Sequence, residues 1–181
     1  RLGAQGYQLT AGAKLTDRHD QLWVYAWTDQ GADKALLNAE LVKAGVAVAW
    51  PRHGLDECQN TLSKSEHIAR EKRLGIWARG WPYLAKRPAA LEALPPGSFV
   101  VVEGKVLRVE KHSKLAYINF GSNYRTDTSA RIPRNRLKAF KAAGIEMPNL
   151  AGRQVRIRGF LSFRGGPMID LDQPHQLELL D

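Results

Sequence analysis

Residues 36–77 read LLNAELVKAGVAVAWPRHGLDECQNTLSKSEHIAREKRLGIW, and the rest of the chain can be placed around this stretch. Its first part carries apolar residues at intervals of four and three, namely Leu37, Leu41 and Ala44. This spacing predicts a short helix with one apolar face, which Gly45 ends. A helix this short needs a second element to cover that face.

The remainder of the stretch predicts that second element. Val46–Trp50 is too apolar and too brief for another helix, so we expect a buried connector or strand that stops at Pro51. Asp56 followed by Gln59 predicts a capping box at the start of a longer helix, with Gly75 as its C-terminal cap. Its predicted inner stripe is Cys58, Leu62, Ser65 and Ala69, and its predicted outer face carries Lys64, Arg70, Glu71, Lys72 and Arg73.

Three motifs in this part of the chain resemble staphylococcal-type thermonucleases. The motif Leu62-x-Lys64-Ser65-Glu66-x-x-Ala69-x-x-x-x-Leu74-x-Ile76-Trp77 is similar to the last helix of that family. The motif Asn38-x-x-Leu41-Val42-x-x-Gly45 is similar to the helix before it, and TDRHDQ at residues 16–21 to the turn before the last barrel strand. The resemblance covers about residues 6–78 and implies an OB-fold nuclease barrel. An ordinary amphipathic helix pair is the alternative.

Residues 6–15 and 22–28 have β-type composition and predict two strands. Within the resemblance they are the last two strands of a five-stranded barrel. The resemblance therefore implies that the sequence is N-terminally incomplete and that the family's metal-binding carboxylates lie upstream of Arg1. The turn equivalent to the family's site holds Asp17, Arg18 and Gln21.

Gln21 stands where the family's turn ends in an arginine. An arginine holds two phosphate oxygens with a planar, permanently charged fork, whereas glutamine carries no charge. We therefore expect weak or no nuclease activity from this chain, and a plain solvated turn is the simplest interpretation of residues 17–21. The alternative is an active calcium-dependent phosphodiesterase whose carboxylates lie upstream of Arg1. Calcium is its cofactor in that alternative, and otherwise we expect no cofactor in this chain.

The composition is that of a globular protein with one large or two small domains. Its 181 residues are 44% hydrophobic and 25% charged, and they contain neither an apolar run of about 18 residues nor a signal-peptide pattern. The net charge of +9 favours a polyanionic partner such as nucleic acid. Residues 98–181 are the more basic part, with 14 basic against 8 acidic residues, compared with 13 against 10 in residues 1–97.

A proline-rich linker, residues 79–97, is expected between two domains, residues 1–78 and 98–181. From Phe99 the pattern predicts three strands, a helix and two strands, which is the order of an oligonucleotide-binding (OB) barrel. The expected strands are 99–109, 115–120, 128–132, 155–161 and 168–171 with a closing edge at 176–180, and the helix begins at Pro133 with Leu137 and Phe140 on its inner face.

The predicted fold class is therefore mainly β with α (α+β). It consists of a partial nuclease-like OB barrel with helices, followed by a second, OB-like five-stranded barrel. Residues 98–181 also resemble the C-terminal domain that accompanies thermonuclease-like domains in some bacterial proteins.

Basic residues interleaved with aromatic ones in residues 98–181 are typical of sites for single-stranded nucleic acid, where bases stack on rings and cations follow the phosphates. The alternative is a charged barrel exterior, with Phe120 and Phe160 in the core. The candidate nucleic-acid-binding residues are Lys111, Lys114, Tyr117, Tyr124, Arg125, Arg131, Arg156, Arg158, Phe163 and Arg164.

No metal site is expected from the sequence. The five histidines and Cys58 lack the paired spacings that zinc needs. Asp170 and Asp172 share one strand face, and we interpret them as structural edge residues. Gly165–Gly166 is a hairpin turn and not a phosphate loop, because no helix follows it.

The sequence as a whole favours a two-domain, thermonuclease-like protein that binds nucleic acid, with a protein-interaction scaffold as a further alternative. Two strands leave open sheet edges in the first barrel, so we expect a preceding segment or a second copy of the chain to complete it. The resemblance implies a periplasmic or secreted location, with a cytoplasmic one as the alternative, and we expect no membrane insertion.

Overall fold

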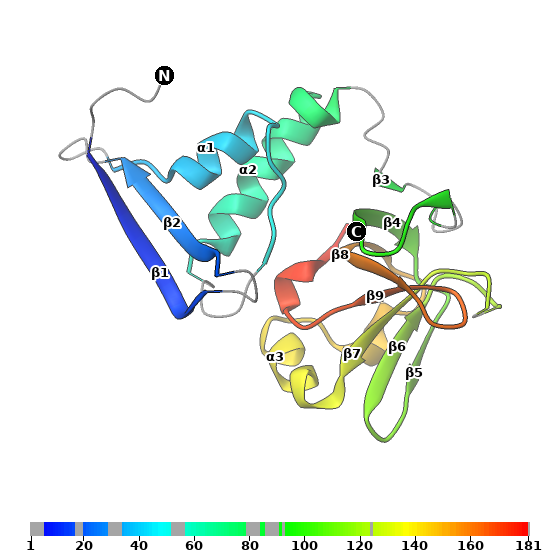
Figure 1. Ribbon diagram of the computed structural model, residues 1–181. Helices are drawn as coiled ribbons and strands as arrows, with labels where there is room; N and C mark the ends of the chain where they lie inside the picture. Colours follow the sequence, from blue (N-terminus) through cyan, green and yellow to red (C-terminus); the bar gives the residue numbers. More distant parts are fainter. Residues whose placement is uncertain are drawn as a thin grey trace. The chain divides into compact units, whose positions relative to one another are not determined.

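The computed structural model describes residues 6–16, 20–28, 34–51, 57–78, 84–85, 91, 93–123 and 125–180. The chain forms two compact units, Arg1–Trp81 and Pro82–Asp181, which we call unit 1 and unit 2. Figure 1 shows the elements of both units. The fold is α+β with most elements being strands, as the sequence predicts.

Unit 1 consists of a two-stranded sheet and two helices. The strands are β1 (Tyr7–Thr16) and β2 (Leu22–Thr28), which pair antiparallel. They are followed by α1 (Leu37–Lys43), α2 (Gln59–Glu71) and a 3-10 turn η1 (Gly75–Trp77). Asn38 ties α1 to β2, because its Oδ1 accepts a hydrogen bond from the Ala26 N–H at 2.8 Å. The two predicted strands and two predicted helices are confirmed.

The buried face of α1 differs from the predicted one. Ala39 and Val42 are buried, whereas Leu41 is 44% exposed and Ala44 is exposed. Residues two apart in a helix point in nearly opposite directions, so burying Ala39 turns Leu41 to solvent. The small side chain of Ala39 on the inner face suits the packing of α1 against α2.

The predicted inner stripe of α2 is confirmed, because Cys58, Leu62, Ser65 and Ala69 are all buried. Burial, and then the charge of Glu57, raises the pKa of the Cys58 thiol, which keeps it protonated at neutral pH. The predicted start of the helix is different. Cys58 is the N-cap residue and makes no capping hydrogen bond, Gln59 is buried, and its Nε2 donates to the Tyr25 hydroxyl at 2.9 Å. Asp56 lies outside the described residues.

The end of α2 also corrects the prediction. The left-handed position after the helix is Arg73, with φ +52°, and not Gly75. Gly75 has φ +51° within η1 and meets Gly45, whose carbonyl oxygen accepts a hydrogen bond from the Ile76 N–H at 2.9 Å. A Cβ on Gly75 would lie 2.1 Å from that oxygen, so this backbone contact requires glycine.

The connector between the helices is irregular and only partly buried, which corrects the expectation of a buried segment or strand at Val46–Trp50. Val46 is 63% exposed, whereas Ala49 is 2% exposed. The Ala49 N–H donates to Oε2 of the buried Glu66 at 2.8 Å. The other Glu66 oxygen accepts from Arg70 at 2.8 Å, so Arg70 does not belong to a purely solvent-facing side of α2.

Unit 2 contains the sheet β3-β4-β8-β9-β7-β6-β5, with β10 also paired to β8. Helix α3 (Leu137–Ala142) ends before Gly144, whose φ is +81°. The strands are β3 (Leu84–Ala85), β4 (Phe99–Lys105), β5 (Arg108–Lys111), β6 (Leu115–Asn119), β7 (Ser129–Pro133), β8 (Gln154–Phe163), β9 (Pro167–Asp170) and β10 (Leu177–Leu179). The helical segments are η3 (Arg134–Arg136), α3 (Leu137–Ala142), η4 (Met147–Leu150) and η5 (Pro174–Gln176).

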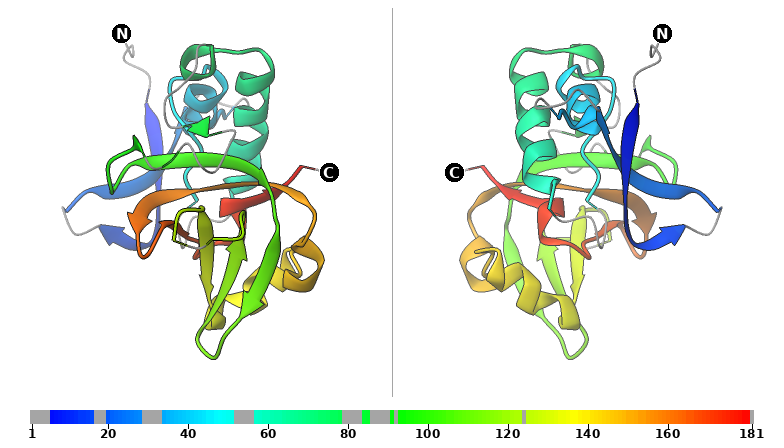
Figure 2. Two further views of the ribbon diagram at one scale, coloured as in Figure 1. Left: turned by 90° about the vertical axis from the view of Figure 1, so that its right-hand side faces the viewer. Right: turned by 90° about the vertical axis from the view of Figure 1, so that its left-hand side faces the viewer.

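This sheet curls back on itself into a barrel-like form (Figure 2). In the sheet, β4 lies next to one edge strand and β5 is the strand at the other edge. In the chain, however, only Val106 and Leu107 separate the two strands. They are therefore two halves of one bent strand, where the sequence predicts a single strand over residues 99–109. The order of three strands, a helix and two strands is confirmed, and it is OB-like.

Alternation along the strands fills the interior of the barrel. Val100, Val102, Ile118 and Ile132 point inward and are almost fully buried, and Phe140 of α3 closes the core. Leu91 also lies in this core with no exposed surface, although the sequence assigns it to the linker. The intervening residues of the same strands face outward and supply the candidate site.

Candidate nucleic-acid interface

The outer face of β5, β6, β7 and β9 carries a row of polar and aromatic side chains. Glu110 and Tyr117 are Cα partners across β5 and β6, Tyr117 and Arg131 across β6 and β7, and Arg131 and Asp170 across β7 and β9. Because neighbouring partners in a sheet point to the same side, these side chains form one line across the strands.

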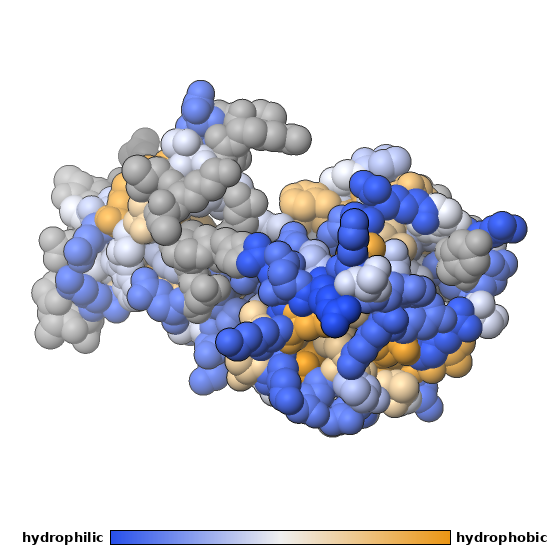
Figure 3. Space-filling view, turned by 90° about the horizontal axis from the view of Figure 1, so that it is seen from below, coloured by the Kyte–Doolittle hydropathy of each residue, from blue (hydrophilic) through white to orange (hydrophobic). Residues whose placement is uncertain are grey.

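An open pocket of about 640 Å³ lies on this face. Seen from below, unit 2 presents hydrophobic residues surrounded by hydrophilic ones (Figure 3). The loop between β5 and β6 forms one side of the pocket, and Arg164 of the β8–β9 hairpin contributes to its lining. The lining residues are Arg108, Glu110, His112, Ser113, Lys114, Leu115, Tyr117, Asn119, Ser129, Arg131, Arg164 and Met168.

The cations of the pocket fall into two groups. In the first group the cations are paired: Arg108 Nε lies 3.0 Å from Glu110 Oε1. Arg131 forms a bidentate ion pair with Asp170, with 2.9 Å between Nη2 and Oδ2. The hydrogen bond to Asp170 raises the pKa of Arg131 despite partial burial. Within the described part of the chain, Lys114 and Arg164 make no ion pair, and both are exposed. These two side chains can therefore bind an anion without first breaking a salt bridge.

Tyr117 supplies an aromatic surface in the same pocket. Its ring centroid lies 5.4 Å from that of His112 in an edge-to-face arrangement with an interplanar angle of 86°. Leu115 and Met168 are the apolar neighbours in the lining. A pocket with a ring, apolar walls and two cations that make no ion pair with any described residue suits a planar base attached to a phosphate.

The turn before β2 is described only in part. Asp17 and Arg18 lie outside the described residues, Asp20 has φ +56°, and Gln21 is exposed. No group of three histidine, cysteine, aspartate or glutamate side chains that could hold a metal ion occurs among the residues that the structure describes. None of the described helices has the length and apolar character that a membrane crossing requires.

Comparison with known proteins identifies the first part of the chain. Residues 5–79, which contain both strands, both helices and η1 of unit 1, match the family model described as staphylococcal nuclease homologue. Residues 5–79 are a staphylococcal nuclease homologue domain. No curated protein matches the chain. A solved structure titled "OBody AM1L10 bound to hen egg-white lysozyme" is 18% identical and covers 50% of this chain and 89% of its own, with a TM-score of 0.36.

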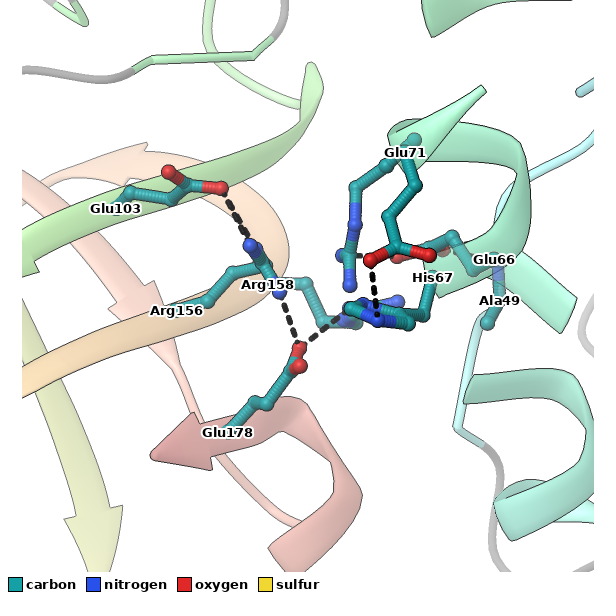
Figure 4. Close-up of polar contacts among 9 residues, drawn as sticks. Ala49, Glu66, His67, Glu71, Glu103, Arg156, Arg158 and Glu178 are labelled. Atoms are coloured by element: carbon teal, nitrogen blue, oxygen red, sulfur yellow. Dashed lines mark hydrogen bonds and ion pairs between the residues drawn. The ribbon is translucent and has the colours of Figure 1, made fainter. Parts of the chain in front are cut away.

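In the nuclease homologue domain, Glu66 is a structural carboxylate. It has no exposed surface and accepts a hydrogen bond from the Ala49 N–H (Figure 4). Its other oxygen accepts from Arg70. Arg70 also lies over the Trp77 ring, 5.8 Å from its centroid. His67 and Glu71, 3.2 Å apart, lie on the exposed side of α2. These contacts account for two residues of the family motif, Glu66 and Trp77, as packing between α2, the connector and η1.

Of the candidate binding residues, Lys114, Tyr117, Arg131 and Arg164 line the pocket together. Lys111 lines a separate, smaller hollow of about 210 Å³ beside α3.

Three candidates lie elsewhere or cannot be placed. Arg125 is exposed in the loop before β7, and Tyr124 lies outside the described residues. Phe163, 41% exposed, ends β8 directly before Arg164.

Arg156 and Arg158 belong to a different part of unit 2. Figure 4 shows Arg156 between Glu103 and Glu178. Its Nη2 lies 2.7 Å from Glu103 Oε1, and its Nη1 lies 2.6 Å from Glu178 Oε2. Burial lowers the pKa of Arg156, but hydrogen bonds and charge from Glu178 and then Glu103 outweigh it and raise the pKa. Arg158 is 3% exposed, with Nη2 at 3.8 Å from Glu178. Arg156 therefore joins β8 to both β4 and β10, Arg158 joins β8 to β10, and neither arginine lines the pocket.

Several residues that line the pocket were not predicted, because the candidates were chosen for positive charge or aromatic character. His112, Leu115, Asn119 and Met168 line the pocket but are not candidates in the sequence. Side chains in β6 (Leu115–Asn119) alternate between the two faces of the sheet, so Leu115 and Asn119 lie on the same face as Tyr117. This alternation is visible in the sequence and could have predicted both residues. Met168 comes from β9 and carries no such local signal.

Proposed function

We propose that unit 2 binds single-stranded nucleic acid across the outer face of β5, β6, β7 and β9. The observation that carries this proposal is the open pocket in which the Tyr117 ring stands with Lys114 and Arg164, two cations without ion pairs among the described residues. A base stacks on the ring, and the phosphates beside it interact with the two cations.

The pocket favours an unpaired strand over a duplex. In a duplex the bases are stacked on one another and only their edges are open, so a ring in a pocket cannot stack on them. The charges of Arg131 and Asp170 cancel in their ion pair, so Arg131 contributes a polar surface to the pocket but little net charge. Net attraction therefore comes from Lys114 and Arg164.

For the nuclease homologue domain we propose weak or no hydrolysis. Gln21 supports this proposal, because a neutral amide at the turn cannot neutralise the charge that grows on a phosphate in the transition state. A calcium-dependent phosphodiesterase activity is the alternative, and substitution at Gln21 distinguishes the two.

The binding proposal is tested by fluorescence anisotropy with a labelled single-stranded 12-nucleotide DNA and the whole chain. We expect Tyr117→Ala to weaken binding by about 5- to 150-fold, the worth of one stacked base. Tyr7→Ala is the matched control, because Tyr7 is a 38% exposed tyrosine on β1. Equal effects of the two substitutions, or equal affinity for the duplex of the same sequence, would contradict the proposal.

A further inference from the structure

A second pair of aromatic side chains lies on the outer face of unit 2, outside the pocket. Phe160 of β8 is 53% exposed. Its ring meets that of Phe99 on β4 with centroids 5.6 Å apart and an interplanar angle of 74°. The sequence leaves open whether Phe160 belongs to the core, and the structure places it on the surface.

The strand register connects this pair to the pocket. Leu161 pairs with Ile169 in the last pair of the β8–β9 ladder, and Phe160 and Asp170 are the next residues beyond that pair, so their side chains turn to the same, outer face. Phe160 is in turn the Cα partner of Phe99. One outward-facing row therefore runs across six strands: Glu110, Tyr117, Arg131, Asp170, Phe160 and Phe99.

The row spaces its aromatic groups at a distance that suits a polynucleotide. Tyr117 and Phe160 are three strands apart, which is about 14 Å at the usual distance between strands. That length equals about four nucleotides at the stacked rise of about 3.4 Å, and fewer when the bases are unstacked.

The surface between the two aromatic groups does not repel phosphate. The carboxylate of Asp170 is held by Arg131, and Ser162 donates to the Met168 carbonyl at 3.1 Å. Arg164 stands at the hairpin that joins β8 to β9 and is free of ion pairs among the described residues. The acidic residues Glu103 and Glu178 are occupied by Arg156.

We infer that Phe160, supported edge-on by Phe99, is a second base-stacking platform, so that one nucleic-acid strand crosses β6, β7, β9 and β8 in turn. This inference rests on the proposed function and deepens it. It assigns the site a footprint longer than the Tyr117 pocket and adds a binding residue that the charge pattern does not indicate.

The test is the dependence of affinity on oligonucleotide length. Labelled oligothymidylates of 3 to 12 nucleotides are titrated with the whole chain and with its Phe160→Ala, Phe160→Trp and Leu179→Ala variants. The wild type should gain affinity as the strand becomes long enough to reach Phe160. Phe160→Ala should lose that gain, about 5- to 150-fold for the longest strand, and keep the affinity for the shortest one. Phe160→Trp should restore the gain, and Leu179→Ala, at a 37% exposed apolar residue on β10, should leave it intact.

The outcomes separate this inference from the proposed function. Wild-type protein that binds no oligonucleotide of any length would overturn the proposed function and the inference with it. Wild-type binding with an unchanged length dependence in Phe160→Ala would overturn the inference alone. An equal loss at every length in Phe160→Ala would also overturn it, because such a loss reports damage to the barrel and not a distant platform.

Discussion

At the scale of single residues, Gln21 bears most directly on hydrolysis. It lies exposed just before β2, in the turn that the sequence resemblance predicts to be equivalent to the family's site. An arginine there would add a permanent positive charge and a fork for two phosphate oxygens. A glutamine offers only uncharged hydrogen bonds, so it stabilises the charge that grows on the phosphate oxygens far less.

In the full-length protein, where the family's metal-binding carboxylates are expected, Gln21→Arg should raise calcium-dependent cleavage of single-stranded DNA by about tenfold or more. Release of acid-soluble nucleotides over time measures the change. Asn60→Arg, which adds the same charge on the exposed side of α2, is the control for general attraction of DNA. Equal cleavage by wild type and Gln21→Arg would show that the turn does not limit hydrolysis.

Single residues also show where sequence reasoning succeeds and fails. Lys114, Tyr117, Arg131 and Arg164 were predicted as binding residues from charge and aromatic character alone, and they line one pocket. Arg156 has the same character, yet its partners Glu103 and Glu178 are 53 and 22 residues away in the sequence. Only the pairing of β8 with β4 and β10 reveals that its charge is already neutralised.

At the scale of elements, the strands were easier to predict than the helix faces. In residues 98–181, apolar and polar residues alternate along each strand, because alternate side chains face the interior of the barrel and the solvent. This alternation predicted the strands, and the segment between the third and fourth strands was predicted to be the helix. For α1, two apolar faces compete, and the contact with α2 decides which one is buried. The bend at Val106–Leu107 was not predicted, because neither residue is a glycine or proline that would interrupt the apolar run 99–109.

The contact between Gly45 and Gly75 fixes α1 relative to η1, and it makes a sharp prediction about unit 1. Gly75→Ala should destabilise unit 1 by more than about 2 kcal/mol, because it combines a left-handed backbone with a Cβ 2.1 Å from the Gly45 oxygen. Urea unfolding followed by tryptophan fluorescence measures this, since all five tryptophans lie in residues 1–81.

The control for this prediction is Gly97→Ala in unit 2. Gly97 also has a positive φ, +84°, but a Cβ there meets nothing within 4 Å. Its substitution should leave the tryptophan-detected transition of unit 1 unchanged. An unchanged midpoint in Gly75→Ala would mean that the two backbones can separate at little cost.

At the scale of the whole molecule, the chain combines a nuclease homologue domain with a barrel-like unit whose outer face carries the proposed interface. Among the described residues, β1 pairs only with β2, and Leu9 on β1 is 59% exposed. Completion of this sheet by a further segment or a second copy of the chain stays a prediction. The net charge of +9 favours a polyanionic partner for the molecule as a whole.

The central claim, that this outer face binds single-stranded nucleic acid through Lys114 and Arg164, is tested most directly by salt dependence. The logarithm of the binding constant for a single strand falls with the logarithm of salt concentration by about 0.7 for each phosphate contact. The double variant Lys114→Ala/Arg164→Ala should therefore have a slope shallower by about 1.4 than the wild type. Lys105→Ala/Lys138→Ala, which removes two exposed lysines outside the pocket lining, should keep the wild-type slope. A wild-type slope in the Lys114→Ala/Arg164→Ala variant would contradict the account.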